Sequence, residues 1–302
     1  MVDKVWDGYR DSFGGLGDYF RSHYLTAVPP MPSNIAPLDA LLCGGFRPGL
    51  HVVGGEPAAG KSAFGLFLSM MAALSGGRVL YVSLEMSRGQ CIERCASFAS
   101  LSTGQPFRWG DVWRLALGAR ERAERGGECI ETCMAHDPVA LALKALEERF
   151  AGLAIADGST IADMADIERT AEDGRKSGLG LLVVDYLQYV SVDGITDEYT
   201  RVSSASKRLN MLGVRLGLPV IALASCSRAG NAKGKPPDMH SFKGSGDIEY
   251  HALSASVIER SPDDPDARRL HVVKNRFGGV TDPDSPIRLL FDGAHNSFSL
   301  ER

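Results

Sequence analysis

A phosphate-binding pattern at residues 55–62 constrains this chain more than any other feature of its sequence. The segment reads Gly-Glu-Pro-Ala-Ala-Gly-Lys-Ser, which fits the pattern G-x-x-x-x-G-K-[ST]. An apolar run at 50–53 precedes it, and an amphipathic stretch at 63–74 follows it. This order places a glycine-rich loop between a strand and the positive end of a helix, where backbone N–H groups can bind polyphosphate. A glycine-rich turn that happens to end in Lys-Ser is the alternative.

The same pattern predicts what the loop would bind. Lys61 would reach the β- and γ-phosphates of ATP. The Ser62 hydroxyl would join the shell of Mg²⁺, which prefers oxygen ligands and would share the phosphate oxygens. The expected nucleotide contacts are Gly55, Glu56, Pro57, Ala58, Ala59, Gly60, Lys61, Ser62 and Ala63. ATP and Mg²⁺ are therefore the expected cofactors.

The remaining segments predict an α/β fold. Apolar runs at 79–83, 153–156, 181–184 and 218–223 alternate with segments of helical spacing. Strands that are apolar throughout are typical of a mostly parallel sheet flanked by helices on both faces. From Ser254 onward the segments are strand-like with short turns, so we expect the sheet to finish in antiparallel strands.

Length and charge narrow the setting. The 302 residues suit one large domain over 36–302, preceded by a short segment at 1–35. The net charge is −4, so contact with DNA would need a local basic patch. The first residues are charged and lack the apolar core of a signal peptide, and the longest apolar stretch, near 63–74, is too short to span a bilayer. We expect a soluble, cytoplasmic protein with no membrane partner.

Four of the six cysteines form two pairs, each with a spacing of four residues. The pairs are Cys91 with Cys95 and Cys129 with Cys133. On a helix this spacing places both thiols on one face, which would suit a four-thiolate metal site. The spacing is not the C-x-x-C of zinc ribbons, and it is also that of a buried helical stripe. We expect reduced core residues.

Two carboxylates follow apolar runs. Asp185 ends the run 181–184 and would emerge beside the phosphate loop, because the carboxyl ends of parallel strands line the ligand crevice. There it would hold Mg²⁺, directly or through water, although an aspartate that caps the next turn is the alternative. Glu85 lies just beyond the run 79–83 and would activate a water for attack on the γ-phosphate. A glutamate stabilised by a helix dipole fits this position equally well.

Five motifs in order resemble those of the DnaB-type replicative helicase family, in its RecA-like C-terminal ATPase domain. They are Ser83-Leu84-Glu85-Met86-Ser87 with Gln90 and Arg94, Asp185-Tyr186-Leu187-Gln188, Pro219–Leu223 through Ser227-Arg228, Gly244–Glu249, and Lys274-Asn275-Arg276-Phe277-Gly278. The resemblance extends from about Pro37 to Leu300. It implies a RecA-like P-loop NTPase core and a ring-forming, hexameric, ATP-driven motor that moves along single-stranded DNA. It also favours the catalytic role for Glu85.

The resemblance implies that the nucleotide lies between subunits. In that family a Lys and an Arg of the neighbour touch the γ-phosphate, and Lys274 and Arg276 match those positions. Positive charge supplied in trans would stabilise the transferring phosphoryl group and couple hydrolysis to the neighbour's position. Without the family, the segment is a strand with a basic exposed end.

The chain departs from the family at two places. The family has a Gln after the strand that corresponds to Val220–Leu223, where this chain has Ser225-Cys226. This puts the coupling of hydrolysis to movement in doubt. Only about 35 residues precede the core, so we do not expect the family's large N-terminal helical domain in this chain. Those residues are aromatic-rich, and we expect an oligomerisation arm, with folding back on its own domain as the alternative. The aromatic residues are Trp6, Tyr9, Phe13, Tyr19, Phe20 and Tyr24.

DNA contact is expected from the segment 228–243. Its basic residues are Arg228, Lys233, Lys235 and Lys243, set among Gly, Asn and Pro, which suits contact with the DNA backbone. The acidic loop 191–200 is a second candidate, and a solvated surface loop is the ordinary explanation for either. The expected partners are single-stranded DNA, further copies of the chain, and replication or loader proteins. The sequence therefore predicts a helicase motor, or alternatively a regulatory or loader ATPase that does not unwind DNA.

Overall fold

The computed structural model describes residues 28–126, 137–226, 236–242 and 245–301. The chain divides into two units, Met1–Pro30 and Met31–Arg302. Residues 1–27 of the predicted aromatic arm lie outside the described residues. The second unit contains the elements on which the predicted site depends.

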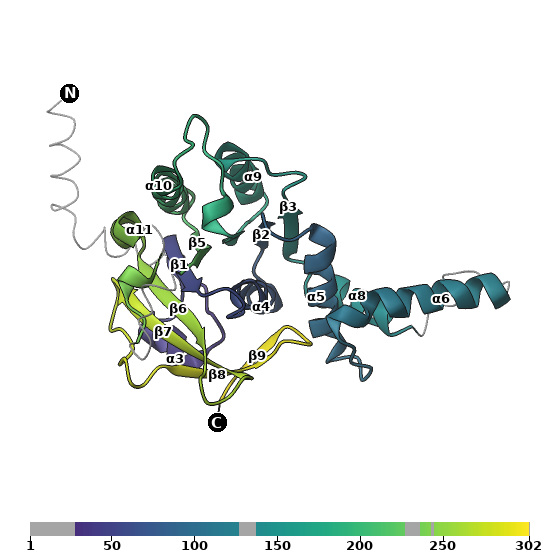
Figure 1. Cartoon of the computed structure of the whole chain (residues 1–302). Coiled ribbons are helices and arrows are strands. Elements are labelled where there is room, and N and C mark those ends of the chain that lie inside the picture. The colour runs from purple at the N-terminus through teal and green to yellow at the C-terminus, as the bar shows by residue number, and fades with distance from the viewer. Residues whose placement is uncertain (1–27, 127–136, 227–235, 243–244, 302) are drawn as a thin grey trace, which may run out of the picture. The chain divides into compact units, whose positions relative to one another are not determined.

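In the described part of the chain, nine strands form one sheet in the order β3-β2-β4-β5-β1-β6-β7-β8-β9 (Figure 1). The strands are β1 Gly49–Gly55, β2 Val79–Ser83, β3 Leu153–Asp157, β4 Leu181–Asp185, β5 Pro219–Ser225, β6 Ser254–Arg260, β7 Ala267–Asn275, β8 Ile287–Asp292 and β9 Ser297–Leu300. Neighbouring strands from β3 to β6 are parallel, and β6 to β9 pair antiparallel. This confirms the predicted α/β class with antiparallel strands at the C-terminal end.

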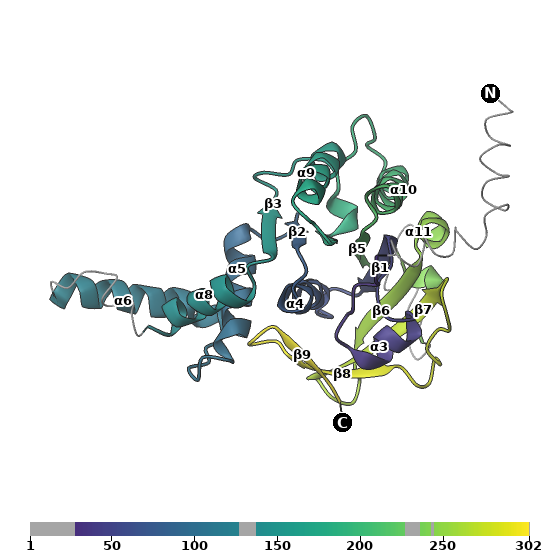
Figure 2. The ribbon, with the colours of Figure 1, turned by 180° about the vertical axis from the view of Figure 1, so that it is seen from behind.

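Helices cover both faces of the sheet (Figure 2). They are α3 Ala36–Leu41, α4 Lys61–Leu74, α5 Arg88–Ser100, α6 Val112–Gly126, α8 Pro138–Arg149, α9 Met164–Lys176, α10 Glu198–Leu216 and α11 Ser245–His251. α4 and α5 contribute to the core on one face, and α9 and α10 to the core on the other. No described helix is both long and apolar enough to cross a membrane.

The strand β4 is apolar from Leu181 to Val184 because alternate residues enter different cores. In β4, Leu181 and Val183 lie in the core beneath α4, whereas Leu182 and Val184 lie in the core beneath α9 and α10. All four side chains are buried. A strand covered on both faces has no solvent-facing position, so it shows no polar alternation.

Helix ends follow side-chain caps that the apolar spacing alone does not reveal. In α10, Asp197 caps the first turn and Gly217 ends the helix at a φ of 62°. In α5, Cys91 and Cys95 are buried on one face, and burial raises the pKa of Cys91 to about 11. They are core residues, as expected. The second pair, at 129 and 133, lies outside the described residues.

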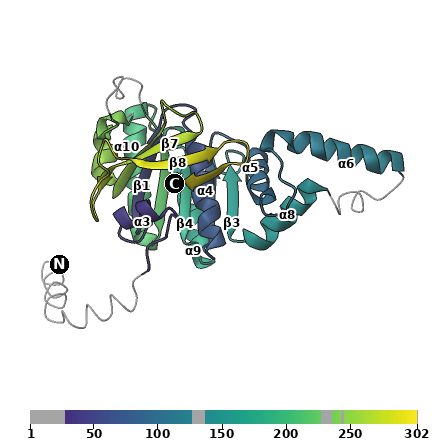
Figure 3. The ribbon, with the colours of Figure 1, turned by 90° about the horizontal axis from the view of Figure 1, so that it is seen from below.

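α6 and α8 lie beyond β3, past one edge of the sheet (Figure 3). They pack with α5 around a small separate core, which contains Ala96, Phe107, Val139 and Ala142. Outside that core α6 exposes Trp113 and Leu117. The described residues between 104 and 150 are mostly helical.

Candidate nucleotide-binding site

The predicted phosphate loop connects the end of β1 to the start of α4. Ala58 and Gly60 adopt left-handed backbone conformations, with φ of 62° and 99°. Gly55 has no room for a side chain, because a Cβ there would lie 2.6 Å from the carbonyl oxygen of Ile258. Side chains cap α5, α8, α9 and α10, but α4 has no side-chain cap. The first N–H groups of α4 are therefore available to an anion.

Lys61 lies folded against the loop. Its Nζ donates to the carbonyl oxygens of Gly55, at 2.8 Å, and Glu56, at 3.0 Å. Burial lowers the pKa of Lys61, while the nearby carboxylates of Asp185 and Glu85 act in the opposite direction. A phosphate group would give this ammonium a stronger, charge-assisted partner than the two carbonyls.

A cleft of about 440 Å³ opens beside the loop, within the range of small-molecule sites. The loop, the segment after β2 and the β8–β9 turn contribute to its lining, together with α5 and the ends of β4 and β5. The lining residues are Pro57, Ala58, Gly60, Lys61, Ser62, Ala63, Glu85, Arg94, Trp109, Tyr186, Ser225, Phe291 and Gly293. Six of the nine predicted nucleotide contacts thus lie on its wall, together with Glu85.

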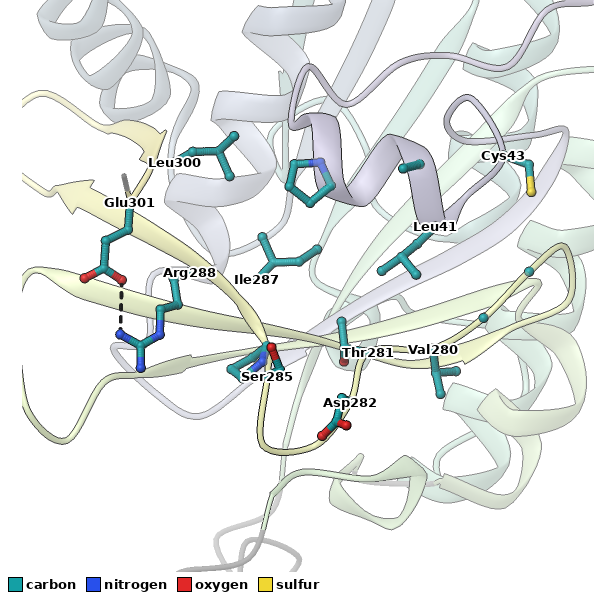
Figure 4. Close-up of a pocket in the computed structure, with 15 residues that line it drawn as sticks. Leu41, Cys43, Val280, Thr281, Asp282, Ser285, Ile287, Arg288, Leu300 and Glu301 are labelled. Atoms are coloured by element: carbon teal, nitrogen blue, oxygen red, sulfur yellow. Dashed lines mark ion pairs between the residues drawn. The ribbon is translucent and has the colours of Figure 1, made fainter.

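A second cavity, of about 780 Å³, lies between α3 and the segment that joins β7 to β8 (Figure 4). Leu41, Val280 and Ile287 supply apolar lining, and Arg288 pairs with Glu301 at 3.6 Å. None of the predicted site residues lines it. Size alone therefore does not identify the nucleotide site in this protein.

Asp185 lies fully buried at the end of β4, opposite Ser83 of β2. Its Oδ2 accepts a hydrogen bond from the Tyr81 hydroxyl at 2.6 Å, whereas Oδ1 is buried and has no partner among the described residues. Burial raises the pKa of Asp185, and the nearby hydroxyls of Tyr81 and Ser62 act in the opposite direction. A buried acceptor without a partner is costly, and a cation would satisfy it.

These donors fit a magnesium ion that is shared with a nucleotide. The described residues include no cluster of three or more His, Cys, Asp or Glu side chains that could hold a metal alone. Ser62 and Asp185 would therefore supply part of the shell, and phosphate oxygens and water the remainder. Mg²⁺ commonly binds in this way, through one or two protein ligands and the phosphates.

Glu85 lies in the turn between β2 and α5, where its side chain is exposed on the cleft wall. The turn is held by Ser83, whose hydroxyl donates to Met86 O at 2.7 Å and accepts from Met86 N at 3.1 Å. α5 begins at Arg88, after the cap residue Ser87. Glu85 is thus outside the first turn of the helix, so the structure does not support the alternative that it serves the helix dipole.

Lys274 and Arg276 lie at the end of the sheet where β1 begins. The phosphate loop of the same chain lies at the other end, where β1 ends. Lys274 is opposite Ala255, near the start of β6, whereas Gly55 is opposite Ile258 near its end. The Lys274 ammonium donates to the Glu249 carbonyl, and Arg276 Nη2 donates to the Tyr250 carbonyl at 2.9 Å. Neither lines the cleft. Within one protomer the structure does not bring them to the predicted nucleotide contacts.

Two arginines that belong to no sequence motif donate hydrogen bonds to carbonyl groups of the phosphate loop. Arg260 Nε donates to the Ala58 carbonyl at 3.0 Å, and Arg268 Nε donates to the Ala59 carbonyl at 2.9 Å. Arg268 is 4% exposed, and its guanidinium lies 4.6 Å from the centre of the Phe291 ring. Burial lowers its pKa, as does the neighbouring Arg260. No motif marks these contacts, which join residues more than 200 positions apart.

Trp109 also belongs to no sequence motif, yet it lines the cleft. Its Nε1 donates to the Gly293 carbonyl at 3.0 Å, and its backbone N–H donates to Ala294 O at 3.1 Å. The guanidinium of Arg94 lies 4.4 Å from the centre of its ring. Trp109 therefore joins the segment after α5 to the β8–β9 turn along one wall of the cleft.

The departure at Ser225-Cys226 has a structural counterpart. Gln188 uses its amide on the backbone of Ser225, accepting from Ser225 N at 3.1 Å and donating to Ser225 O at 3.5 Å. Ser225 lines the cleft, while Cys226 is buried. The four predicted DNA contacts, Arg228, Lys233, Lys235 and Lys243, lie outside the described residues.

Comparison with known proteins identifies relatives of this chain. The family model of the DnaB-like helicase C-terminal domain matches residues 30–299. The replicative DNA helicase DnaB of Geobacillus stearothermophilus is 28% identical over 295 residues, covering 91% of this chain and 58% of the helicase. The replicative DNA helicase DnaC of Bacillus subtilis is 25% identical over 286 residues, with the same two shares. The chain thus spans somewhat more than half the length of these relatives.

Solved structures show the same fold. A structure described as an ATPase domain matches with a TM-score of 0.76 at 18% identity, covering 96% of this chain and 99% of that domain. A DnaB-like replicative helicase, studied with its interactions with primase, matches with a TM-score of 0.73 at 19% identity, covering 96% of this chain and 66% of the other. The predicted RecA-like core is confirmed. Because the family model covers most of its length, this chain belongs to the DnaB-like helicase C-terminal domain family.

Proposed function

We propose that this chain binds and hydrolyses MgATP in the cleft beside the loop 55–62, and that hydrolysis drives movement along single-stranded DNA in a ring of identical subunits, a hexamer. The observation that carries the proposal is the convergence of four groups from three segments. Lys61 and Ser62 come from the loop and α4, and Glu85 from the turn after β2, and all three line the cleft. Asp185 is buried at the end of β4 and interacts electrostatically with Glu85 and Lys61. Membership of the helicase family supports the same assignment.

Each group has a distinct task in this proposal. The N–H groups of the loop and Lys61 bind the β- and γ-phosphates, and Ser62 and Asp185 hold Mg²⁺, which neutralises phosphate charge. Glu85 takes a proton from a water as the water oxygen bonds to the γ-phosphorus. The bond from the γ-phosphorus to the bridging oxygen breaks, and ADP and phosphate leave.

Lys274 and Arg276 act in the neighbouring subunit's site in this proposal. Both residues lie at the end of the sheet away from the phosphate loop of their own chain. This position supports a role in trans, because one protomer cannot bring them to its own loop without unfolding β7. Arg228, Lys233, Lys235 and Lys243 contact the DNA backbone, and the segment 1–35 contacts the adjacent subunit. The family resemblance and the local basic charge support these two assignments.

A second function is favoured by the residues at 225–226. In this alternative the chain is a regulatory or loader ATPase that acts with replication proteins and does not unwind DNA. The amide of Gln188 already engages the backbone of Ser225, at the place where the family has a glutamine side chain. Hydrolysis would then be uncoupled from movement.

The ATPase rate with and without single-stranded DNA separates the two functions. A motor is stimulated by DNA, whereas a regulator is not, and strand displacement on a forked duplex then tests movement. We expect Lys61→Ala to abolish nucleotide binding or turnover. Lys144→Ala, at an exposed lysine of α8 that pairs with Glu148 at 3.9 Å, is the matched control and should retain both. A fully active Lys61→Ala variant would exclude the proposed site.

A further inference from the structure

Tyr81 connects the two segments that bear the predicted magnesium ligands. It lies in the middle of β2, and its side chain is fully buried. Its hydroxyl donates to Asp185 Oδ2 at 2.6 Å and lies 3.5 Å from the carbonyl oxygen of Ser62. One phenol therefore contacts the last residue of β4 and the second residue of α4.

The register of the sheet explains why a tyrosine reaches this carboxylate. β2 and β4 are parallel neighbours, with Tyr81 opposite Val183 and Ser83 opposite Asp185. Tyr81 and Asp185 point to the same face of the sheet, one strand and two residues apart, because side chains alternate along a strand. A serine or threonine at 81 would be too short for this diagonal, and a phenylalanine would reach it without a donor.

The hydrogen bond makes the two oxygens of the carboxylate unequal. Oδ2 has a partner, and Oδ1 is buried without one among the described residues. We propose that Tyr81 is a positioning residue for the metal: its hydroxyl fixes the Asp185 carboxylate so that Oδ1 alone is available to bind Mg²⁺, directly or through one water. This inference rests on the proposed binding of MgATP.

The surroundings of the Tyr81 ring keep the hydroxyl in place. The ring belongs to the same core as Phe64 of α4 and Val183 of β4, which limits its movement. Outer-sphere groups of this kind orient metal ligands and alter metal affinity.

Tyr81→Phe removes the hydroxyl and keeps the ring, so it tests the hydrogen bond directly. We expect the Mg²⁺ concentration that gives half-maximal ADP binding to rise about tenfold, because Asp185 loses the donor that orients it. ADP binding in EDTA, measured by calorimetry on the same sample, should be unchanged and shows that the loop is folded. Tyr199→Phe, at an exposed ring of α10, is the control and should leave both values unchanged.

Several outcomes would overturn the inference. One is an unchanged Mg²⁺ requirement in Tyr81→Phe, and another is an equal loss of ADP binding with and without Mg²⁺, which would indicate a purely structural role. In an Asp185→Ala background, Tyr81→Phe should cause no further change in the Mg²⁺ requirement, and an additive change would also contradict the proposal. Failure of the unmodified protein to bind MgADP would instead refute the proposed function.

Discussion

The two ends of β7 bear the same kind of charge in different surroundings. At its start, Arg268 is buried and donates to the phosphate loop of its own chain. Just past its end, Arg276 is exposed and donates to a carbonyl of α11. With roughly 3.4 Å per residue the two ends lie about 27 Å apart. The strand therefore places one arginine against the cleft of its own chain and the other at the far end of the sheet.

The difference shows how burial changes what a cation can do. Arg268 also donates to the carbonyls of Pro265 and Ala267, so its guanidinium is fixed on backbone oxygens and cannot move to a ligand. Arg276 is exposed to solvent and can exchange its carbonyl partner for phosphate. We infer that the first shapes the loop and the second is the group suited to reaction.

The largest effect, on the rate of ATP hydrolysis, is expected from Arg276 at the exposed end of β7. Arg276→Ala should lower kcat about a thousandfold or more, which is typical of a cation that stabilises the transferring phosphoryl group. ATP binding should remain largely intact, because the loop is distant. Steady-state kinetics and nucleotide binding by calorimetry measure the two effects, and a fully active variant would rule out the role in trans.

Mixing subunits decides which protomer supplies Arg276. Arg276→Ala subunits have intact loops, and Lys61→Ala subunits have an intact Arg276. A mixture should regain activity that neither variant has alone, since some interfaces combine the intact parts of both. Absence of any recovery in mixed rings would indicate that one subunit supplies both residues of a site.

Acid should lower the stability of the fold through His51, which lies at the same end of the sheet as Arg276. His51 of β1 contacts Ser254 at 2.7 Å and the Arg47 carbonyl at 2.8 Å, and burial lowers its pKa from 6.5 to about 4. A lowered pKa in the folded state means that its stability contribution is complete above pH 6.5 and is lost as the pH falls toward 4. The loss is about 3 kcal/mol of unfolding free energy.

Urea unfolding at about pH 7 and about pH 4 measures this loss. His51→Gln has no group that titrates in this window, so its free energy of unfolding should fall less between the two pH values than that of the unmodified protein. Equal falls in both proteins would show that other groups cause the acid sensitivity.

A smaller effect, on ATP binding, is expected from Arg268 at the buried end of β7. Arg268→Met keeps an apolar stem on Phe291 but removes the donor to the Ala59 carbonyl, and we expect about tenfold weaker ATP binding. Arg269→Met is the matched control, because Arg269 pairs with Asp263 at 3.0 Å and does not contact the loop. An equal loss of affinity in both variants would indicate a general effect of the strand.

The smallest effect should come from Arg260. It makes the same kind of bond to the loop as Arg268, at Ala58, but its side chain is exposed and water can replace it. Arg260→Met should weaken ATP binding by about twofold, in the same calorimetric assay. A loss as large as that in Arg268→Met would show that burial is not what separates the two arginines.

The fold and the centre of the site were predictable because their signals are local. The phosphate loop, Asp185 and the apolar strands each depend on residues within about ten positions, and the structure has them in the predicted order. Arg268 and Tyr81 were not predictable, since their partners are 209 and 104 positions away and no motif connects them. Contacts of this kind are set by strand order, which periodicity does not give.

Gln188 joins the end of β5 to the segment that follows β4. By pairing with both the N–H and the C=O of Ser225, its amide acts as one additional rung of the sheet at the last residue of β5. The chain that leaves β5 is thus fastened to the turn that follows Asp185. Because Gln188 follows Asp185 by three residues, a shift of the end of β5 would also displace the end of β4 that bears this carboxylate.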